Sequence, residues 1–194
     1  GDLKIYENTH VKEIKGTKAL ANRGCISAKS IVVSTHFPFI NKHGSYFLKL
    51  YQNRSYALAL ENAPLPEHMY VDDDSKGLSF SSFGNMLLLL GGAHRTGKKG
   101  GSYNELRRFK EKHFKDAKER YFWAAQDTMS LDKVPYIGRY SKSTPDLYVA
   151  CGFNKWGLTS SMLSGEIIAA LIMGESHEYA KAFDPSRSVL KPQL

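Results

Sequence analysis

Apolar and polar residues alternate through the first part of the chain. Val11 and Ile14 are separated by polar residues, and Gly16 interrupts the run. Such an alternation is typical of a strand with one buried face. Residues 31–33 (Ile-Val-Val) are instead uniformly apolar and β-branched, as expected for a strand buried on both faces, and Pro38 follows them. The N-terminal segment is therefore predicted to be β-structure.

The middle of the chain repeats this pattern in shorter runs. Residues 46–60, 69–71, 78–83 and 86–90 are rich in apolar and aromatic residues and are separated by prolines, aspartates and glycines. These runs predict a second set of short strands. Only Gly84-Asn85 separates the last two runs, and this pair favours a tight hairpin turn.

Two segments have the pattern of helices. Ser102 and Glu105 have the spacing of a capping box, and apolar or aromatic positions then recur every three or four residues, at Leu106, Phe109, His113, Ala117 and Tyr121. Residues 160–173 form an apolar helix that Gly174 should end, and the polar tail after it is expected to be extended. This order of elements predicts an α+β fold, with the first and last segments in one layer and the middle segments in another.

Charge and cysteine content restrict the partners. The chain has 27 Lys and Arg against 19 Asp and Glu, a net charge of +8, which favours anionic partners. The basic residues are not interleaved with aromatic residues in a nucleic-acid-binding motif, so nucleic acid is a disfavoured partner. Cys25 and Cys151 lie far apart, which suits a reducing cytoplasm and predicts neither a disulfide framework nor a thiolate metal site. The histidines show no ligand spacing, so no metal site is expected.

The termini and the apolar runs bear on location. No apolar run reaches the length of a membrane span, so we expect no membrane partner. The sequence starts at Gly1 without a methionine or signal-peptide character. We therefore expect a fragment of a longer chain, from which an upstream signal could have been lost.

The most informative unit is an apolar strand at 147–150 that leads through the glycine-containing turn 152–157 into the last helix. A helix start presents unpaired N–H groups and partial positive charge, which suit an anion or a carbonyl group of a cofactor. The alternative is an ordinary strand-to-helix turn that uses glycine for close packing.

Three motifs lie in this half of the chain: W-A-A-Q-D at 123–127, D-K-V-P-Y-I-G at 132–138 and P-D-L-Y-V-A-C-G-F-N-K-W-G-L-T at 145–159. Together they resemble the closing motifs of D-amino-acid oxidase-like flavoproteins, a family that includes glycine and sarcosine oxidases. The segments 11–14 and 28–35 resemble the part of that family that returns to the FAD domain. The resemblance is nearest to bacterial members in which a Rieske iron-sulfur domain follows the flavoprotein domain. These members contain sequences similar to G-G-x-H-R-T-G and G-F-N-K-W-G.

The resemblance implies a division of the chain. Residues 1–37 would belong to an FAD-binding domain, 38–128 to a substrate-binding domain and 129–176 again to the FAD-binding domain, and 177–194 would be a tail or linker. No G-x-G-x-x-G motif opens a βαβ unit, so the N-terminal FAD-binding half that holds the pyrophosphate is expected upstream. FAD is accordingly expected in the full-length protein but not in this chain alone, and a 2Fe-2S cluster only in a domain outside it.

By the same resemblance, the turn and the start of the last helix would face the flavin pyrimidine edge, through Gly152, Phe153, Asn154, Lys155, Trp156, Gly157, Leu158 and Thr159. The helix start would stabilise negative charge on the reduced ring. Val11 would touch the adenine through its backbone. The alternative for Val11 is a plain strand residue.

Three residues of the predicted substrate domain are candidate catalytic groups. His94 and Arg95 would point towards the flavin, where a histidine can accept or relay a proton; the alternative is a solvated loop. Asp127 stands where glycine oxidase-like enzymes place an arginine that binds the substrate carboxylate. An acid cannot do this, so a simple α-amino acid bound in the usual way is disfavoured. The alternative for Asp127 is a local cap or pair.

Other departures from the family concern the flavin and nucleotides. The apolar run 86–90 lacks the lysine with which sarcosine oxidase-like members react with oxygen, and Ala125 stands near the position of their flavin-tethering cysteine. Fast oxidase behaviour and a covalent flavin are therefore not expected. The run 92–98 imitates a Walker A loop, but Lys99 stands where a Ser or Thr must bind Mg²⁺, which disfavours a nucleotide hydrolase.

The functional hypothesis is an FAD-dependent oxidoreductase that removes hydride from a C–H bond beside the nitrogen of an amine or amino-acid-like substrate. Its electrons would pass to an iron-sulfur centre, and the isolated chain would be inactive. The alternatives are a non-catalytic interaction or scaffold fragment and, less favoured, a basic nucleic-acid-binding module.

Overall fold

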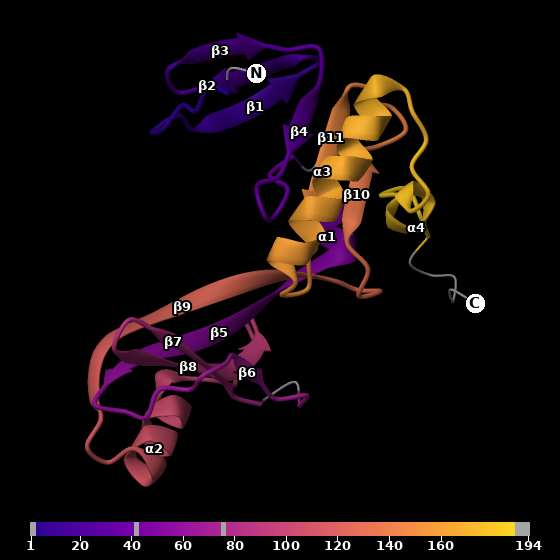
Figure 1. Ribbon diagram of the computed structural model, residues 1–194. Coiled ribbons are helices and arrows are strands. Elements are labelled where there is room, and N and C mark those ends of the chain that lie inside the picture. The colour runs from indigo at the N-terminus through magenta and orange to yellow at the C-terminus, as the bar shows by residue number, and fades with distance from the viewer. Residues whose placement is uncertain (1–2, 41–42, 75–76, 189–194) are drawn as a thin grey trace. The chain divides into compact units, whose positions relative to one another are not determined.

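The computed structural model describes residues 3–40, 43–74 and 77–188, which form two compact units (Figure 1). Unit 1 comprises the residues up to Leu50 and those from Thr128 onwards, and unit 2 is Tyr51–Asp127. Strands and helices are mixed, and most strand pairs are antiparallel, which confirms the predicted α+β class.

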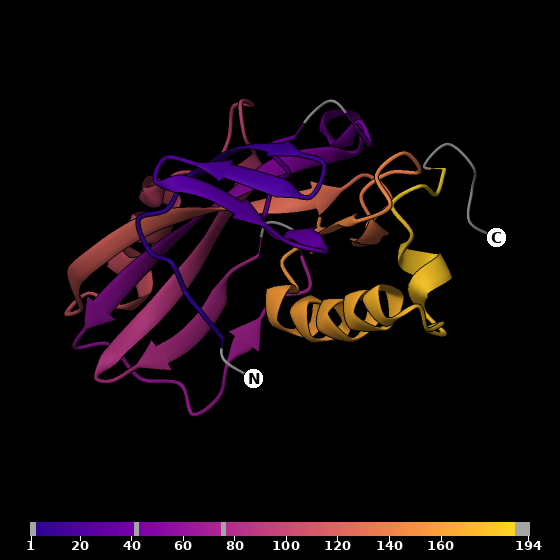
Figure 2. The ribbon, with the colours of Figure 1, turned by 90° about the horizontal axis from the view of Figure 1, so that it is seen from above.

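Unit 1 begins with a three-stranded antiparallel sheet of β1 (Val11–Lys15), β2 (Lys18–Ala21) and β3 (Gly24–Ser27). Gly16, with φ 57°, makes the turn between the first two strands, which a left-handed backbone conformation requires. The sequence pattern predicted β1 and its end at Gly16 but not β2 and β3, because these short strands bury few side chains. Figure 2 shows the three strands side by side.

A second sheet of unit 1 has the order β10 (Tyr136–Arg139), β11 (Leu147–Cys151) and β4 (Ile31–Val33). β10 and β11 are antiparallel, whereas β11 and β4 are parallel. Alternate residues of β11 pack on opposite faces: Val149 joins a tyrosine-rich cluster on one face, and Tyr148 joins the helix-facing cluster on the other. Burial on both faces explains the uniformly apolar sequence of β11. The prediction that the strand 31–33 is buried on both faces is wrong for the described residues, because Val33 is buried but Val32 is 42% exposed.

The described residues of unit 1 form three helices: α1 (Tyr46–Lys49), α3 (Gly157–Met173) and α4 (Ala180–Phe183). Helix α3 buries Ile167 and Ile168 against β10 and β11, and Gly174, with φ 79°, ends it as predicted. The prediction that the tail after Gly174 is extended is wrong, because α4 forms there and packs on β10.

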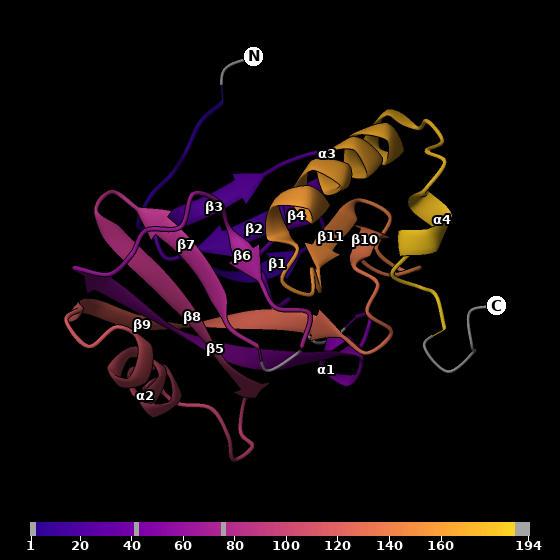
Figure 3. The same cartoon turned by 60° about the horizontal axis from the view of Figure 1, so that its bottom comes forward.

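The part of unit 2 that the structure describes forms a five-stranded sheet with one helix (Figure 3). In spatial order its strands are β6 (Tyr70–Val71), β7 (Ser79–Phe83), β8 (Met86–Arg95), β5 (Leu50–Glu61) and β9 (Lys118–Ser130). The Phe83 and Met86 pair flanks the predicted Gly84-Asn85 hairpin turn, which is confirmed.

Helix α2 (Tyr103–His113) covers one face of this sheet and buries Leu106 against Leu58 and Leu89. Ser102 caps it as predicted, since its hydroxyl accepts from the Asn104 N–H at 3.2 Å. The predicted extension of the helix to Tyr121 is wrong. The helix ends at His113, and the apolar positions beyond it belong to a core contact and to β9.

Candidate functional site

The turn between β11 and α3 depends on a glycine at its first position. Gly152 has φ 71°, in the left-handed region. A Cβ built on it would lie 3.0 Å from Leu50 Cδ2 and 3.4 Å from Ser130 Cβ. Gly152 is therefore required by the fold of unit 1, whatever else the turn does.

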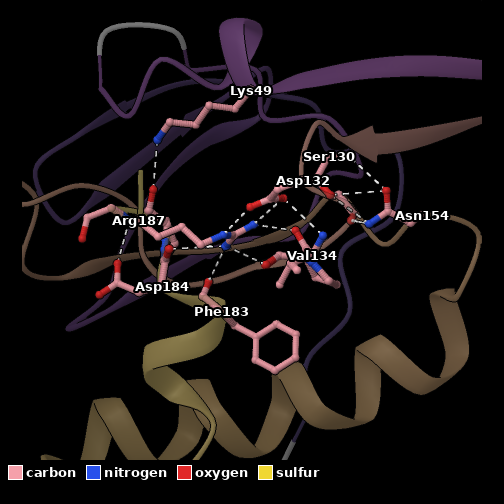
Figure 4. A network of polar contacts seen from close by, with 12 residues as sticks. Lys49, Ser130, Asp132, Val134, Asn154, Phe183, Asp184 and Arg187 are labelled. Carbon is pink, nitrogen blue, oxygen red and sulfur yellow. Dashed lines mark hydrogen bonds and ion pairs between the residues drawn. The ribbon is translucent and has the colours of Figure 1, made fainter. Parts of the chain in front are cut away.

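The next part of the turn is held by the side chain of Asn154. Asn154 and Lys155 have φ values of 51° and 73°, a left-handed pair that L-residues adopt at a cost. The Asn154 amide donates to Gly152 O at 2.7 Å and to Ser130 Oγ at 2.9 Å, and its Oδ1 accepts from the Ser130 N–H at 3.0 Å (Figure 4). These bonds fix the unusual backbone. The side chain of Asn154 is thus directed into the protein, and Phe153 packs on the α3 core.

The remainder of the turn is open. Residues 155–159 are exposed, and the exposed fractions of Trp156 and Leu158 are 72% and 88%. Within the described ranges, no side chain caps the start of α3, and a Cβ built on Gly157 would meet nothing within 4 Å. Uncapped N–H groups beside free space and apolar side chains fit the polar edge of a planar ring such as a flavin.

Val11, the predicted adenine contact, is half-buried in β1. It pairs with Ala21 of β2, and the register shifts between Val11 and Glu13. Such an irregularity interrupts the hydrogen-bonded ladder next to Val11.

His94, in unit 2, lies on the face of the sheet that α2 covers. Its ring stacks on Tyr56 with centroids 5.8 Å apart, and Tyr56 meets Tyr103 of α2 edge-on at 4.8 Å. A Cβ on Gly101 would approach His94 Nδ1 to 2.6 Å. Among the described residues, this buried Nδ1 has no hydrogen-bond partner. His94 is thus enclosed by the start of α2.

Arg95 and Asp127 lie on the opposite face of the same sheet. Successive strand residues alternate, so Arg95 points away from α2, and its guanidinium carbon lies 5.0 Å from the centroid of the Tyr51 ring. On β9, Phe122 meets Tyr103 of α2 at 5.1 Å, and alternation then places the half-buried Asp127 on the other face. Unit 2 therefore brings Arg95 and Asp127, but not His94, to one face.

Two departures from the resembled family also take definite places in unit 2. In the run 86–90 of β8, Leu87 and Leu89 are buried in the α2 core. Ala125 lies exposed in β9. The run 86–90 contains no lysine, and position 125 is an alanine.

A polar network in unit 1 was not expected from the sequence. Arg187 of the tail makes a two-pronged ion pair with Asp132, Nε to Oδ2 at 2.7 Å and Nη2 to Oδ1 at 3.0 Å. Its side chain is 8% exposed, and it also donates to four main-chain carbonyls and lies 3.8 Å from the centroid of the Tyr136 ring. In the sequence, Asp132 was noted only as part of the motif 132–138, and no feature of the polar tail indicated a role for Arg187.

The charges of this network have a clear electrostatic effect. Burial opposes ionisation of Asp132, but hydrogen bonds from Arg187 and from the Val134 N–H outweigh it, so the pKa of the carboxyl is lowered. Lys49 donates to Pro185 O at 2.9 Å, and burial followed by repulsion from Arg187 lowers its pKa. The ion pair is therefore formed throughout the neutral range.

The cysteine and tyrosines of the unit 1 core are poor candidates for chemistry. Burial raises the pKa of the Cys151 thiol to about 12 and that of Tyr136 to about 12. Burial also raises the pKa of Tyr46, whose hydroxyl donates to Tyr140 O at 2.8 Å. These groups stay protonated at neutral pH, so Cys151 presents no thiolate.

Across residues 3–40, 43–74 and 77–188, no group of three or more His, Cys, Asp or Glu could hold a metal ion. In the same part of the chain, no helix combines the length and apolar character needed to cross a membrane.

One curated relative matches the chain along nearly its whole length and is itself longer. A protein of Bacillus subtilis, YhfW, whose name describes a Rieske 2Fe-2S iron-sulfur protein, is 34% identical over 203 residues, which cover 98% of this chain and 40% of YhfW. This chain therefore spans about two fifths of that curated relative.

Solved structures show the same fold. Glycine oxidase from Geobacillus kaustophilus aligns with a TM-score of 0.75 at 19% identity, covering 95% of this chain and 53% of the oxidase. L-proline dehydrogenase from P. horikoshii aligns with a TM-score of 0.71 at 21% identity, covering 93% of this chain and 54% of the dehydrogenase. The family model of FAD dependent oxidoreductases, DAO, matches residues 2–171. The chain therefore belongs to the DAO family of FAD dependent oxidoreductases.

Proposed function

We propose that this chain carries the flavin-facing turn and the substrate-facing sheet of an FAD-dependent enzyme that oxidises the C–H bond beside the nitrogen of an amine or amino-acid-like substrate. The observation that carries the proposal is the uncapped, exposed start of α3 after a turn fixed by Gly152 and Asn154. Family membership supports it, and so do structural neighbours whose titles name glycine oxidase and proline dehydrogenase.

In unit 1, residues 152–159 would hold the flavin. The backbone N–H groups at the start of α3 would donate to the pyrimidine edge, while Trp156 and Leu158 would exclude water from the ring. When bound, the flavin supplies a hydride acceptor. The positive end of α3 would favour the reduced, more negative ring, and Val11 would contact the adenine through its backbone.

In unit 2, Arg95 and Asp127 would contact the substrate. Asp127 brings a negative charge, which suits a cationic amine and repels a carboxylate. Arg95 lies on the same face by alternation and next to Tyr51, and it would bind an anionic group of the substrate. His94 lies behind this face, so we propose that it supports Arg95 through the strand and does not contact the substrate.

A further FAD-binding segment is the first proposed partner of unit 1. β4 is the last strand of its described sheet, and Val32 is 42% exposed on the face that carries α3. Leu158, Met162 and Ile172 form an exposed apolar stripe along α3, on the side away from its own core. An N-terminal half with the glycine-rich pyrophosphate turn would cover both surfaces.

The electron acceptor and the location are the finer parts of the proposal. The name of YhfW supports a Rieske domain with a 2Fe-2S cluster as the acceptor, held outside this chain. Exposed Cys25 and buried Cys151 are both free thiols, which supports a reducing, cytoplasmic location.

The test is anaerobic reduction of the flavin in the complete protein. We expect purified protein to show a flavin absorbance band that bleaches when a secondary or primary amine is added, and to react slowly with oxygen afterwards. A protein that folds but carries no flavin would favour the scaffold alternative. A flavin that no amine reduces would overturn the substrate class alone.

A further inference from the structure

We propose that Arg187 is a positioning residue for the flavin-facing turn, and that the segment 179–188 acts as its brace. Arg187 holds Asp132, Asp132 belongs to the same tight turn as Ser130, and Ser130 holds Asn154 (Figure 4). The importance of this chain of contacts for the cofactor rests on the proposed function, but the contacts themselves do not.

The turn 130–133 is the central element of the brace. The Lys133 N–H donates to Ser130 O at 3.3 Å, and Lys133 has φ 61°. Ser130 at one end of this turn makes three hydrogen bonds to the Asn154 side chain, at 2.9, 3.0 and 3.3 Å. Asp132, two residues later, faces the opposite way and accepts both prongs of Arg187. One small turn therefore links the tail to the flavin-facing turn.

The ion pair between Arg187 and Asp132 fixes the orientation of the two side chains. A guanidinium that meets a carboxylate in two parallel hydrogen bonds defines an orientation, which a single bond does not. The further bonds from Arg187 to the carbonyls of Val134, Pro135, Phe183 and Asp184 join the turn 130–133 to α4. Lys49 strengthens the same joint, because its ammonium donates to Pro185 O while its own carbonyl accepts from the Leu131 N–H at 3.0 Å.

The position that the brace controls is strained. The left-handed backbones of Asn154 and Lys155 are held by the Asn154 N–H bond to Thr128 O and by the three bonds between Ser130 and the Asn154 side chain. If the turn 130–133 shifts, the Asn154 side chain loses its bonds to Ser130 and keeps only the bond to Gly152 O, and the first N–H groups of α3 change direction relative to a flavin edge. The brace should thus affect the flavin through the direction of these donors, although no residue of 179–188 need touch it.

The experiment uses the complete protein and the variant Arg187→Lys, which keeps the charge but cannot form the two-pronged pair. Arg107→Lys is the matched control, because Arg107 forms the same kind of pair with Glu119, at 2.9 and 2.7 Å, in unit 2. Hydrogen exchange in the turn 152–159 is measured without FAD at the amides of Asn154 and Trp156, which donate to Thr128 O and Phe153 O at 3.3 and 2.8 Å. We expect at least a tenfold acceleration in Arg187→Lys and less than a twofold change in Arg107→Lys.

Two flavin measurements separate positioning from general stabilisation. In Arg187→Lys the FAD dissociation constant should rise about tenfold, and the preference for reduced over oxidised flavin should fall about tenfold, which lowers a two-electron midpoint potential by about 30 mV. Acceleration confined to 179–188, with an unchanged turn and potential, would overturn the proposal. If the parent protein binds no FAD, the proposed function fails, and the exchange data alone still decide whether Arg187 positions the turn.

A second variant guards against loss of folding. Ser130→Ala removes the two hydroxyl bonds between Ser130 and Asn154, at 2.9 and 3.3 Å, and leaves the bond from the Ser130 N–H and the ion pair intact. We expect it to accelerate exchange at 152–159 without changing exchange at 179–188. Equal protection of 152–159 in Ser130→Ala and the parent would contradict the proposed path.

Discussion

Two glycines of the turn 152–159, which we propose faces the flavin, should respond oppositely to the same substitution. Gly152→Ala places a methyl group on a residue with φ 71°, which costs about 1–2 kcal/mol for an L-residue. The new Cβ would also lie 3.0 Å from Leu50 Cδ2, which is buried, so that side chain must shift at a cost of about 1 kcal/mol. We therefore expect unit 1 to lose about 2–3 kcal/mol of unfolding free energy.

Gly157→Ala is the comparison. Its Cβ would meet nothing within 4 Å and its φ is not left-handed, while alanine favours a helix over glycine. Unit 1 should gain up to about 0.5 kcal/mol. In the complete protein, the same methyl group should nevertheless weaken FAD binding, because it would occupy the space next to the uncapped N–H groups.

Hydrogen exchange of the protected amides in β11 measures the stability of unit 1 separately from unit 2. Gly152→Ala should accelerate this exchange about 30- to 150-fold, which is the equilibrium factor for 2–3 kcal/mol. Titration with FAD measures the second effect, and Gly157→Val should enlarge it. A Gly152→Ala protein as protected as the parent would refute the packing argument, and unchanged FAD affinity in a folded Gly157→Val protein would remove this turn from the site.

Two further changes test single carboxylates. The pKa of Asp132 is lowered in the folded state, so its contribution to stability is present above the unfolded pKa of about 3.9 and is lost as the pH falls through the folded value. Asp132→Asn should lower the unfolding free energy by about 3 kcal/mol at neutral pH. In urea denaturation at a series of pH values, the unfolding free energy of the variant should fall less steeply at acid pH than that of the parent, and an equally steep fall would contradict the role of the ion pair. Asp127→Asn should slow flavin reduction by cationic amines more than by neutral ones in stopped-flow experiments, whereas equal slowing would make Asp127 a structural residue.

The sequence predicted those elements whose signals are local. The capping serine of α2, the hairpin at Gly84-Asn85 and the glycine that ends α3 each act within a few residues, and all three are confirmed. The helix α2 was predicted too long because Ala117 continues the apolar spacing of the helix. In the structure Ala117 lies in the loop after the helix and packs into the same core from there. Periodicity alone cannot tell a continuing helix from a contact made by the next segment.

The long-range parts of the site could not be read from the sequence. Arg187 lies 55 residues from Asp132, and an isolated arginine in a polar tail carries no sign of a buried partner. The face on which a strand residue lies depends on which element covers the sheet, so His94 and Arg95, adjacent in sequence, were grouped together although they point to opposite faces. The turn 152–159 was identified from its sequence motif. The role of Asn154 in holding the turn could be recognised only from the structure, which places Ser130 next to it.

The central claim is that this chain contributes one part of an FAD site. Calorimetry with FAD tests it most directly, on the complete protein and on the 194-residue chain alone. The complete protein should bind one FAD per chain. The chain alone should purify without colour and give no binding heat at micromolar FAD, since it lacks a glycine turn for the pyrophosphate and its remaining contacts must offset several kcal/mol of lost freedom. Stoichiometric binding by the chain alone would show a complete site, and a complete protein that folds without binding FAD would contradict the flavin function.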